Sequence, residues 1–284
     1  MSPRLCGCTF IHPCRTPAQG MAQMRELGFA RVDVGVGGGN ANFDPVQVAE
    51  HPLHFAGQLR EEADRLELVL NECFLLNFGW PINSPDAALR RRTEVLFAEL
   101  CLFADRAEFA SILVIPGPVH AELGAEASLD LSADALRALV DIASAAGVRL
   151  NVEADMDSCA NTPERALRLC KQSPGLSLTL DYSHFVCQGI TLDRVNMLHP
   201  FVRHMHVRQA APGRIATDLD EGIIDYPAVL ARLHAAGYCG VYCIEYLAMN
   251  DSPAAAEQAR SRTVAAAHYF NDLLQECANA KCAH

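Results

Sequence analysis

Short apolar runs alternate with longer amphipathic segments along the whole chain. The runs are rich in valine, isoleucine and leucine and have few polar interruptions, which is typical of parallel strands covered on both faces. We predict eight such strands, whose starts follow one another at similar intervals. They are Leu5–Phe10, Ala30–Gly35, Leu66–Leu70, Ser111–Ile115, Val148–Glu153, Leu176–Asp181, Val202–Val207 and Val241–Glu245.

The segments between these runs begin like helices, with a capping residue that is usually followed by proline at the first helical position. Ser132 is expected to open a helix over Ala133–Ala146, which ends at Gly147. The full set of starts is Thr16-Pro17, Ser84-Pro85-Asp86, Ser132, Thr162-Pro163-Glu164 and Ser252-Pro253. Eight successive βα units predict an α/β fold, a closed (β/α)₈ barrel of the TIM type, with residues 1–284 as a single domain.

The longest irregular stretch, Asn71–Ser84, follows the third predicted strand and contains the only tryptophan, Trp80. Disordered segments are poor in aromatic residues, and long structureless loops are uncommon in compact domains. We therefore predict that this stretch forms a wall of the active site. Asn71, together with His12 at the end of the first strand, is expected to face the same mouth and contact the substrate.

Composition restricts the possible partners. The chain has 34 acidic and 23 basic residues and a net charge of −11, whereas a nucleic-acid partner requires a concentrated basic surface. No apolar run reaches the roughly 18 residues of a membrane span, and Met1–Arg15 lacks the features of a signal peptide. We expect a cytoplasmic protein that binds neither nucleic acid nor membrane, with its twelve cysteines reduced and mostly packed as small apolar residues.

Each of the last four predicted strands has an ionisable residue at its last or next-to-last position, namely Glu153, Asp181, His206 and Glu245. Barrel enzymes keep their active sites at this carboxyl end of the strands. Three carboxylates that converge there would repel one another and be costly to bury. A divalent cation resolves both problems, and three oxygens with one imidazole suit manganese, magnesium, cobalt or zinc. We predict one divalent metal ion, with manganese preferred.

Each of these residues also has an ordinary explanation when it is taken alone. A single Glu or Asp at a strand end is more often a helix cap or an ion-pair partner, and a single histidine is more often structural. Four such residues at the same end of four consecutive strands are much harder to explain in that way. The combination therefore favours a metal site.

Several short segments, mostly in the second half, carry a resemblance in their order and spacing. They are Asn151-Val152-Glu153, Leu180-Asp181-Tyr182-Ser183-His184, His204-Met205-His206-Val207-Arg208, Glu221-Gly222-Ile223-Ile224-Asp225, and Gly237-Tyr238-Cys239-Gly240 leading into Ile244-Glu245. Over residues 148–247 the chain resembles the xylose isomerase-like barrel family, specifically its sugar phosphate isomerase/epimerase members, which include ketose 3-epimerases of the D-tagatose type. Asn83-Ser84-Pro85-Asp86 with Arg90, and Pro116-Gly117, extend a weaker match into the first half.

The resemblance implies roles for individual residues. Glu153 and Glu245 match glutamates that bind the metal and also exchange the substrate proton, while Asp181 and His206 match the residues that complete the metal shell. His184 matches a histidine that hydrogen-bonds a substrate oxygen beside the metal. An arginine after the seventh strand commonly completes substrate binding, and Arg208 is the first candidate for it, ahead of Arg214.

These roles imply a metal-dependent isomerase or epimerase of carbohydrate metabolism that acts on a sugar or a sugar phosphate. A metal bound to the substrate carbonyl and the adjacent hydroxyl stabilises the enediolate that forms when the α-proton leaves. One glutamate removes the proton and the other returns it. Trp80 would cover the apolar face of the sugar, unless it instead fills the core. The only partner expected besides the small-molecule substrate is a second copy of the chain, because homodimers are the commonest assembly.

Two departures from the family pattern leave the substrate and the reaction open. Many relatives carry a histidine where this chain has Asp155, and an acidic residue where it has Gln209. One alternative is a metal-dependent dehydratase (a lyase) of a keto-inositol or keto-acid, which begins with the same proton removal. Another is a non-catalytic sugar-binding relative. A nuclease resembling endonuclease four would need further histidines after the second and third strands and a His-x-Asp-x-His element after the seventh, and none of these is visible in the sequence.

Overall fold

The computed structural model describes residues 1–11, 16–37 and 43–282. Eight parallel strands close into a barrel in the order β1-β10-β7-β6-β5-β4-β3-β2. Their bounds are β1 (Leu5–Cys8), β2 (Arg31–Val36), β3 (Val69–Leu75), β4 (Ser111–Val114), β5 (Arg149–Val152), β6 (Ser177–Asp181), β7 (Val202–Val207) and β10 (Tyr242–Ile244). The predicted (β/α)₈ barrel is therefore confirmed.

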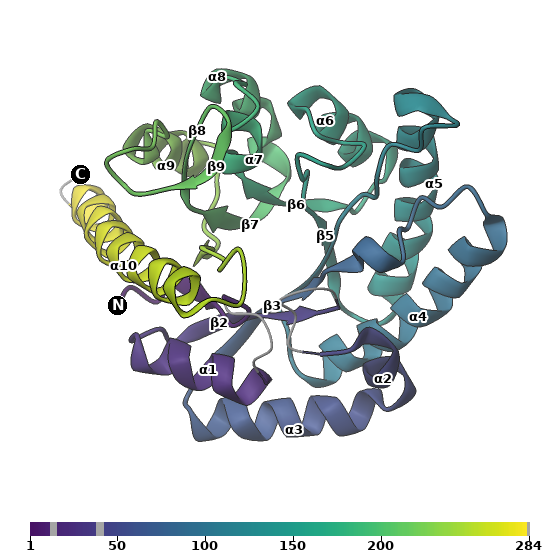
Figure 1. Ribbon diagram of the computed structural model, residues 1–284, viewed down its shortest axis with the longest axis horizontal. Helices are drawn as coiled ribbons and strands as arrows, with labels where there is room; N and C mark the ends of the chain where they lie inside the picture. The colour runs from purple at the N-terminus through teal and green to yellow at the C-terminus, as the bar shows by residue number, and fades with distance from the viewer. Residues whose placement is uncertain (12–15, 38–42, 283–284) are drawn as a thin grey trace.

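Helices form a ring outside the strands (Figure 1). They are α1 (Pro17–Glu26), α2 (Pro45–Glu50), α3 (Pro52–Arg65), α4 (Ala87–Arg106), α5 (Gly124–Ala145), α6 (Pro163–Gln172), α7 (Tyr182–Val186), α8 (Leu192–Val195), α9 (Tyr226–Ala235) and α10 (Pro253–Cys282), with 3₁₀ turns η1 (Asn77–Gly79) and η2 (Asn196–Phe201). An antiparallel pair, β8 (Gln209–Ala211) and β9 (Arg214–Thr217), follows β7. Among the helices described, none combines the length and the apolar character needed to cross a membrane.

Several predicted helix starts are confirmed, and their caps show why the helices begin there. The Thr16 side chain accepts a hydrogen bond from Gln19 N, and the Gln19 side chain accepts one from Thr16 N, which closes a capping box before α1. Thr162 accepts a hydrogen bond from Arg165 N and Asp86 accepts one from Ala88 N. Each contact satisfies a backbone N–H that has no partner within its own helix.

Two predicted boundaries are wrong. The third strand is Val69–Leu75 rather than Leu66–Leu70, because Leu66 still caps α3 and Glu67 has a left-handed φ of 52° that ends the helix instead of starting the strand. Asn71 consequently lies inside β3 and not at its end. Helix α5 begins at Gly124 rather than after Ser132, since Ser132 is a buried residue of that helix whose hydroxyl donates to Pro116 O at 2.8 Å.

A layer of buried polar side chains fills the barrel interior, where barrels of this class usually pack valine, isoleucine and leucine. Glu72 in β3 accepts hydrogen bonds from Ser111 and Asn151 and, across the barrel, from Thr179 in β6. Because β3 and β6 are not neighbours, this contact must pass through the interior. Each strand supplies one member of this polar layer, which comprises Cys6, Asp33, Glu72, Ser111, Asn151, Thr179, His204 and Cys243.

Two helical glycines give opposite expectations for the free energy of unfolding. A Cβ added at Gly20 in α1 would lie 2.4 Å from Thr9 O, whereas one added at Gly57 in α3 would meet nothing within 4 Å. Gly20→Ala is expected to lower this free energy by about 1–3 kcal/mol, because α1 would have to move away from the barrel. Gly57→Ala is expected to raise it by about 0.5–1 kcal/mol, because alanine favours the helix. Chemical denaturation measures both, and effects of the same sign would contradict this packing.

Candidate metal centre

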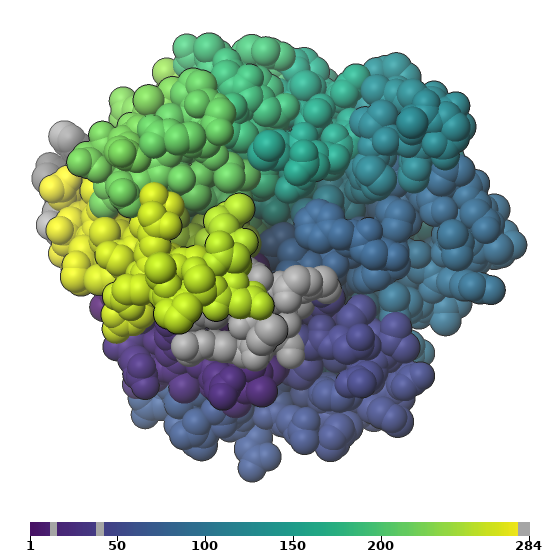
Figure 2. Space-filling view, in the orientation of Figure 1, coloured from purple at the N-terminus to yellow at the C-terminus, as the bar shows by residue number. Residues whose placement is uncertain are grey.

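Four ionisable side chains meet at the carboxyl ends of neighbouring strands. Glu153 follows β5, Asp181 ends β6, His206 lies in β7 and Glu245 follows β10, and these four strands are adjacent in the barrel. Each residue is two positions beyond a member of the polar layer, so strand alternation turns all four side chains inward. None is more than 3% exposed. Figure 2 shows that one face of the molecule is hollowed near its centre, beside the yellow-green segment that precedes α10.

His206 connects the two glutamates. Its Nδ1 is 2.9 Å from Glu153 Oε1 and 3.5 Å from Glu245 Oε2, and one donor atom from each of the three residues lies within 4.8 Å of the others. Glu153, Asp181 and His184 form a second group within the same limit. Because Glu153 belongs to both groups, the five side chains make one continuous cluster, called the acidic cluster below.

Arg208, between β7 and β8, places its guanidinium inside the acidic cluster. Its Nη2 lies 2.8 Å from Asp181 Oδ2 and its Nη1 lies 3.2 Å from Glu245 Oε2. Its Nε donates to Ser183 Oγ at 2.8 Å. The side chain is only 7% exposed, so this positive charge offsets part of the negative charge that the three buried carboxylates would otherwise hold without compensation.

The environments of the two glutamates shift their pKa values in opposite directions. Burial raises the pKa of both, because a carboxylate loses hydration when it is buried. At Glu153 the attraction of His206 outweighs burial and lowers the pKa to about 2. At Glu245 burial prevails over the attraction of Arg208 and His206, and the pKa is raised. Burial also opposes the charge on His206, but the two glutamates raise its pKa well above the usual value.

The donor atoms fit a divalent metal ion. Asp181 Oδ2 and Glu245 Oε2 are buried, and apart from their ion pairs with Arg208 neither has a hydrogen-bond partner among the residues that the structure describes. Their lone pairs are thus available although Arg208 lies nearby. Carboxylate oxygens and imidazole nitrogens together suit metals such as manganese or zinc, and a cation would relieve the repulsion among three buried carboxylates. The buried His, Asp and Glu residues therefore form a cluster of the kind that holds a metal ion.

His184, in α7, turns its Nε2 toward the same place. This atom lies 4.0 Å from Glu153 Oε1 and 3.9 Å from Asp181 Oδ2. On the other side of the ring, Nδ1 lies 3.6 Å from Asp155 Oδ2 and 3.3 Å from Met156 N, which donates a hydrogen bond to it. Asp155, the first departure from the family pattern, thus lies behind His184, while the hydrogen bond from Met156 N holds the ring.

The other residues that were predicted to contact the substrate are Trp80, Asn71, Arg214 and His12, and the described ones lie less favourably for such contacts. Trp80 is partly buried and packs against the core. The amide of Asn71 donates to the Asp33 carboxylate in the polar layer at 3.0 Å. This side chain therefore contacts the barrel interior and not the mouth. Arg214 is exposed in β9 and forms a 2.8 Å ion pair with Glu221. His12 lies outside the described residues.

Gln209, the second departure from the family pattern, forms hydrogen bonds with the backbone of a neighbouring segment and not with the acidic cluster. Its side chain donates to Ile224 O at 2.8 Å and accepts from Ile224 N at 3.0 Å. Gly222 passes so close that an added Cβ would lie 2.1 Å from Gln209 Oε1. An acidic residue could accept from Ile224 N but could not donate to Ile224 O, so glutamine suits this bridge.

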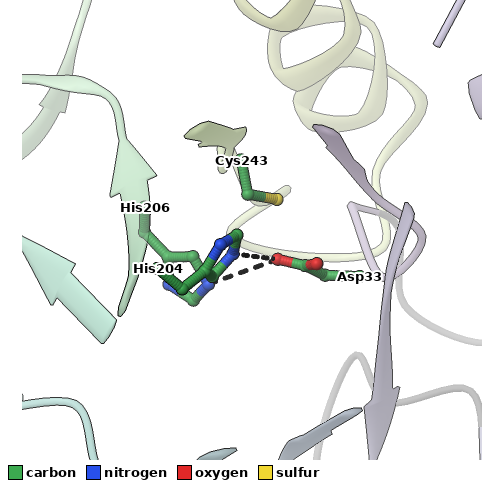
Figure 3. Close-up of side chains that lie close together, drawn as sticks. All are labelled: Asp33, His204, His206 and Cys243. Carbon is green, nitrogen blue, oxygen red and sulfur yellow. Dashed lines mark hydrogen bonds and ion pairs between the residues drawn. The ribbon is translucent and has the colours of Figure 1, made fainter. Parts of the chain in front are cut away.

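One residue next to the acidic cluster escaped the sequence analysis. Asp33 of β2 is fully buried; its Oδ2 lies 2.7 Å from His204 Nε2 and 3.6 Å from His206 Nε2 (Figure 3). A signal was present, because Asp33 interrupts an apolar strand between Val32 and Val34. Alternate residues of a barrel strand point inward, and a lone acid at such a position indicates a buried partner.

Solved structures with the same fold include several sugar epimerases. A D-tagatose 3-epimerase-like protein is 19% identical to this chain with a TM-score of 0.75, and the match covers 98% of this chain and 99% of that one. A D-psicose 3-epimerase from Clostridium cellulolyticum H10, solved with D-tagatose, is 14% identical with a TM-score of 0.74, covering 95% and 99%. An IolI protein with a bound zinc atom is 18% identical with a TM-score of 0.73, covering 96% and 98%.

At these identities the structural likeness establishes the fold alone. No curated protein matches the sequence. The family model described as "Xylose isomerase-like TIM barrel" matches residues 21–265, which is most of the chain and includes every member of the acidic cluster. The chain therefore belongs to the xylose isomerase-like TIM barrel family.

Proposed function

We propose that the protein is a divalent-metal-dependent isomerase or epimerase of a sugar or sugar phosphate. The observation that carries this proposal is the convergence of Glu153, Asp181, His206 and Glu245 at the ends of four adjacent strands. These four residues would hold the ion. The names of several structural neighbours are consistent with this activity, since they describe 3-epimerases and one 3-keto-D-glucoside 4-epimerase.

The reaction would consist of moving one proton at a carbon next to a carbonyl group. A bound ion would supply electrostatic stabilisation for the oxygen that becomes negative when the proton leaves. Glu153 and Glu245 are the groups that would accept and return the proton. Glu153 Oε1 and Glu245 Oε2 lie 2.9 and 3.5 Å from the same nitrogen of His206, so both carboxylates border the position where the ion and the substrate would bind.

His184 and Arg208 would bind and orient the substrate. The Nε2 atom of His184 faces the acidic cluster, and the guanidinium of Arg208 lies between Asp181 and Glu245. Both side chains are buried, so little water would surround a substrate oxygen that they bind. Hydrogen bonds to such an oxygen would be stronger there than in water.

Metal analysis of the purified protein, beside a Glu153→Gln, His206→Ala double variant, tests the site. About one divalent ion per chain is expected in the wild type by the coordination argument, and it should be lost in the variant. The companion assay follows the entry of solvent deuterium into ketoses, keto-inositols and hydroxypyruvate. Uptake into one of these substrates, without loss of water, would support an isomerase or epimerase.

Other results would change the assignment. Loss of water from a keto-inositol or keto-acid would make the protein a dehydratase that uses the same proton-removing groups. A wild-type protein that binds no divalent ion would overturn the proposal and leave a sugar-binding protein as the better interpretation.

A further inference from the structure

The two ring nitrogens of His206 face different surroundings. Nδ1 points into the acidic cluster, where Glu153 and Glu245 lie. Nε2 points down into the polar layer, where it lies 3.6 Å from Asp33 Oδ2 and 3.9 Å from Glu72 Oε2. Both distances exceed a normal hydrogen bond, and Nε2 is buried without a hydrogen-bond partner among the described residues.

The Asp33 carboxylate is held in place from several directions. Its Oδ1 accepts hydrogen bonds from Cys6 Sγ at 3.2 Å, from Asn71 Nδ2 at 3.0 Å and from Glu72 N at 3.0 Å. Oδ1 therefore has no capacity left. Oδ2 accepts from His204 Nε2 at 2.7 Å, and a carboxylate oxygen has a second lone pair. That remaining acceptor site faces His206 (Figure 3).

Glu72 is the other carboxylate near Nε2, but its hydrogen bonds direct it elsewhere. Ser111 and Asn151 donate to its Oε1 at 2.7 and 2.6 Å, and Thr179 donates to its Oε2 at 2.7 Å. These donors come from the strands on the side away from β2. The facing oxygen of each carboxylate accepts one hydrogen bond, but Asp33 Oδ2 is the nearer to Nε2, at 3.6 Å against 3.9 Å for Glu72 Oε2.

A second metal ion is a poorer explanation for the group formed by Asp33, His204, His206 and Cys243. Asp33 Oδ2 and His204 Nε2 are joined by a direct 2.7 Å hydrogen bond, so the proton on Nε2 already occupies the direction that an ion would need. The amide of Asn71 lies 3.4 Å from His204 Nδ1, which fits a ring protonated on Nε2.

We infer that Asp33 is a positioning residue that holds a proton of His206 on Nε2. When an ion displaces the Nδ1 proton that Glu153 Oε1 now accepts at 2.9 Å, the Nδ1 lone pair is then directed at the metal position. The inference rests on the proposed function, because it concerns the metal that function requires. Asp33 touches neither substrate nor metal; it fixes the tautomer and the orientation of a ligand. Partners of this kind typically change metal affinity about 10- to 100-fold when they are removed.

Zinc titration of the metal-stripped protein by calorimetry tests the inference. Asp33→Asn keeps the size of the side chain but removes the charge, and it is expected to weaken zinc binding about 10- to 100-fold. Ser111→Ala is the matched control, since it removes a hydrogen bond to Glu72 in the same layer, and Ser111 itself has no hydrogen bond to Asp33 or His206. The control should bind zinc as the wild type does, and unchanged binding by Asp33→Asn would overturn the inference.

A measurement on the unaltered chain makes the test independent of how well the variant folds. Long-range ¹H–¹⁵N correlation spectra of histidine-labelled, zinc-loaded protein report which nitrogen of His206 carries the proton, and a His206→Gln variant identifies its signals. We expect zinc on Nδ1 and the proton on Nε2. Zinc on Nε2 would overturn the inference alone, whereas a wild type that binds no zinc or other divalent ion would overturn the proposed function as well.

Discussion

Glu153→Gln is expected to lower the rate of deuterium exchange into the substrate by about 10²- to 10⁴-fold, the usual contribution of a positioned proton-transfer group. Glutamine preserves the shape of the side chain but cannot accept the proton. Glu153 also makes the shortest contact with His206 in the acidic cluster, with Oε1 2.9 Å from Nδ1. It belongs to both groups of possible metal ligands that make up this cluster. Loss of its charge should therefore reduce the bound metal as well, which metal analysis measures in the same samples.

Glu126→Gln provides the control for this loss. Glu126 is an exposed acid in α5 that pairs with Arg168 at 2.7 Å, so this variant removes one negative charge far from the acidic cluster. It should exchange deuterium at the wild-type rate. Exchange by Glu153→Gln within tenfold of the wild type, with the metal retained, would show that another group moves the proton.

Replacing Arg208 with methionine is expected to lower the free energy of unfolding of the metal-free protein by about 3–5 kcal/mol, the usual cost of removing one partner from a buried ion pair. The loss would be this large because both Asp181 Oδ2 and Glu245 Oε2 face the guanidinium. Without it, three buried carboxylates would share only the charge of His206. Urea denaturation of metal-stripped protein measures the difference.

An exposed arginine variant and the addition of a divalent ion serve as controls for the Arg208 variant. Arg214→Met removes an arginine whose ion pair with Glu221 is about half exposed, and such surface pairs contribute only about 0–1 kcal/mol. Added divalent ion should restore much of the stability of the Arg208 variant, because it supplies the missing positive charge and binds the folded state preferentially. An Arg208 variant as stable as the Arg214 variant would mean that the carboxylates do not depend on this guanidinium.

The barrel and its acidic cluster were predictable from sequence for a common reason. Parallel strands that are buried on both faces leave nearly continuous apolar runs, and a charge that follows such a run lies at the carboxyl end of the barrel. Glu153, Asp181, His206 and Glu245 each end or follow a run in this way. The order of the strands in the closed barrel then brings them together without any contribution from long loops.

The predictions failed where local propensity and tertiary packing disagreed. Leu66-Glu67-Leu68 looks like the start of a strand, but Glu67 takes a left-handed conformation at the end of α3, and the strand begins later. The interior network was hidden for another reason. Asp33 and His204 are 171 positions apart in sequence, and each looks like a single interruption of a strand. The two residues come into contact only when the barrel closes, so a local sequence pattern cannot predict that they are partners.

Under the proposed function, the polar layer has a consequence for attempts to alter the metal or substrate preference by directed evolution. Mutant libraries for barrel enzymes usually vary the loops at the mouth, since loops tolerate change. Here the ring of His206 faces Asp33 and Glu72, which lie deep in β2 and β3 and would stay constant in such a library. Residues in one hydrogen-bonded network respond non-additively to substitution. Libraries that vary positions 33 and 72 together with the mouth will therefore sample orientations of the histidine that loop libraries leave out.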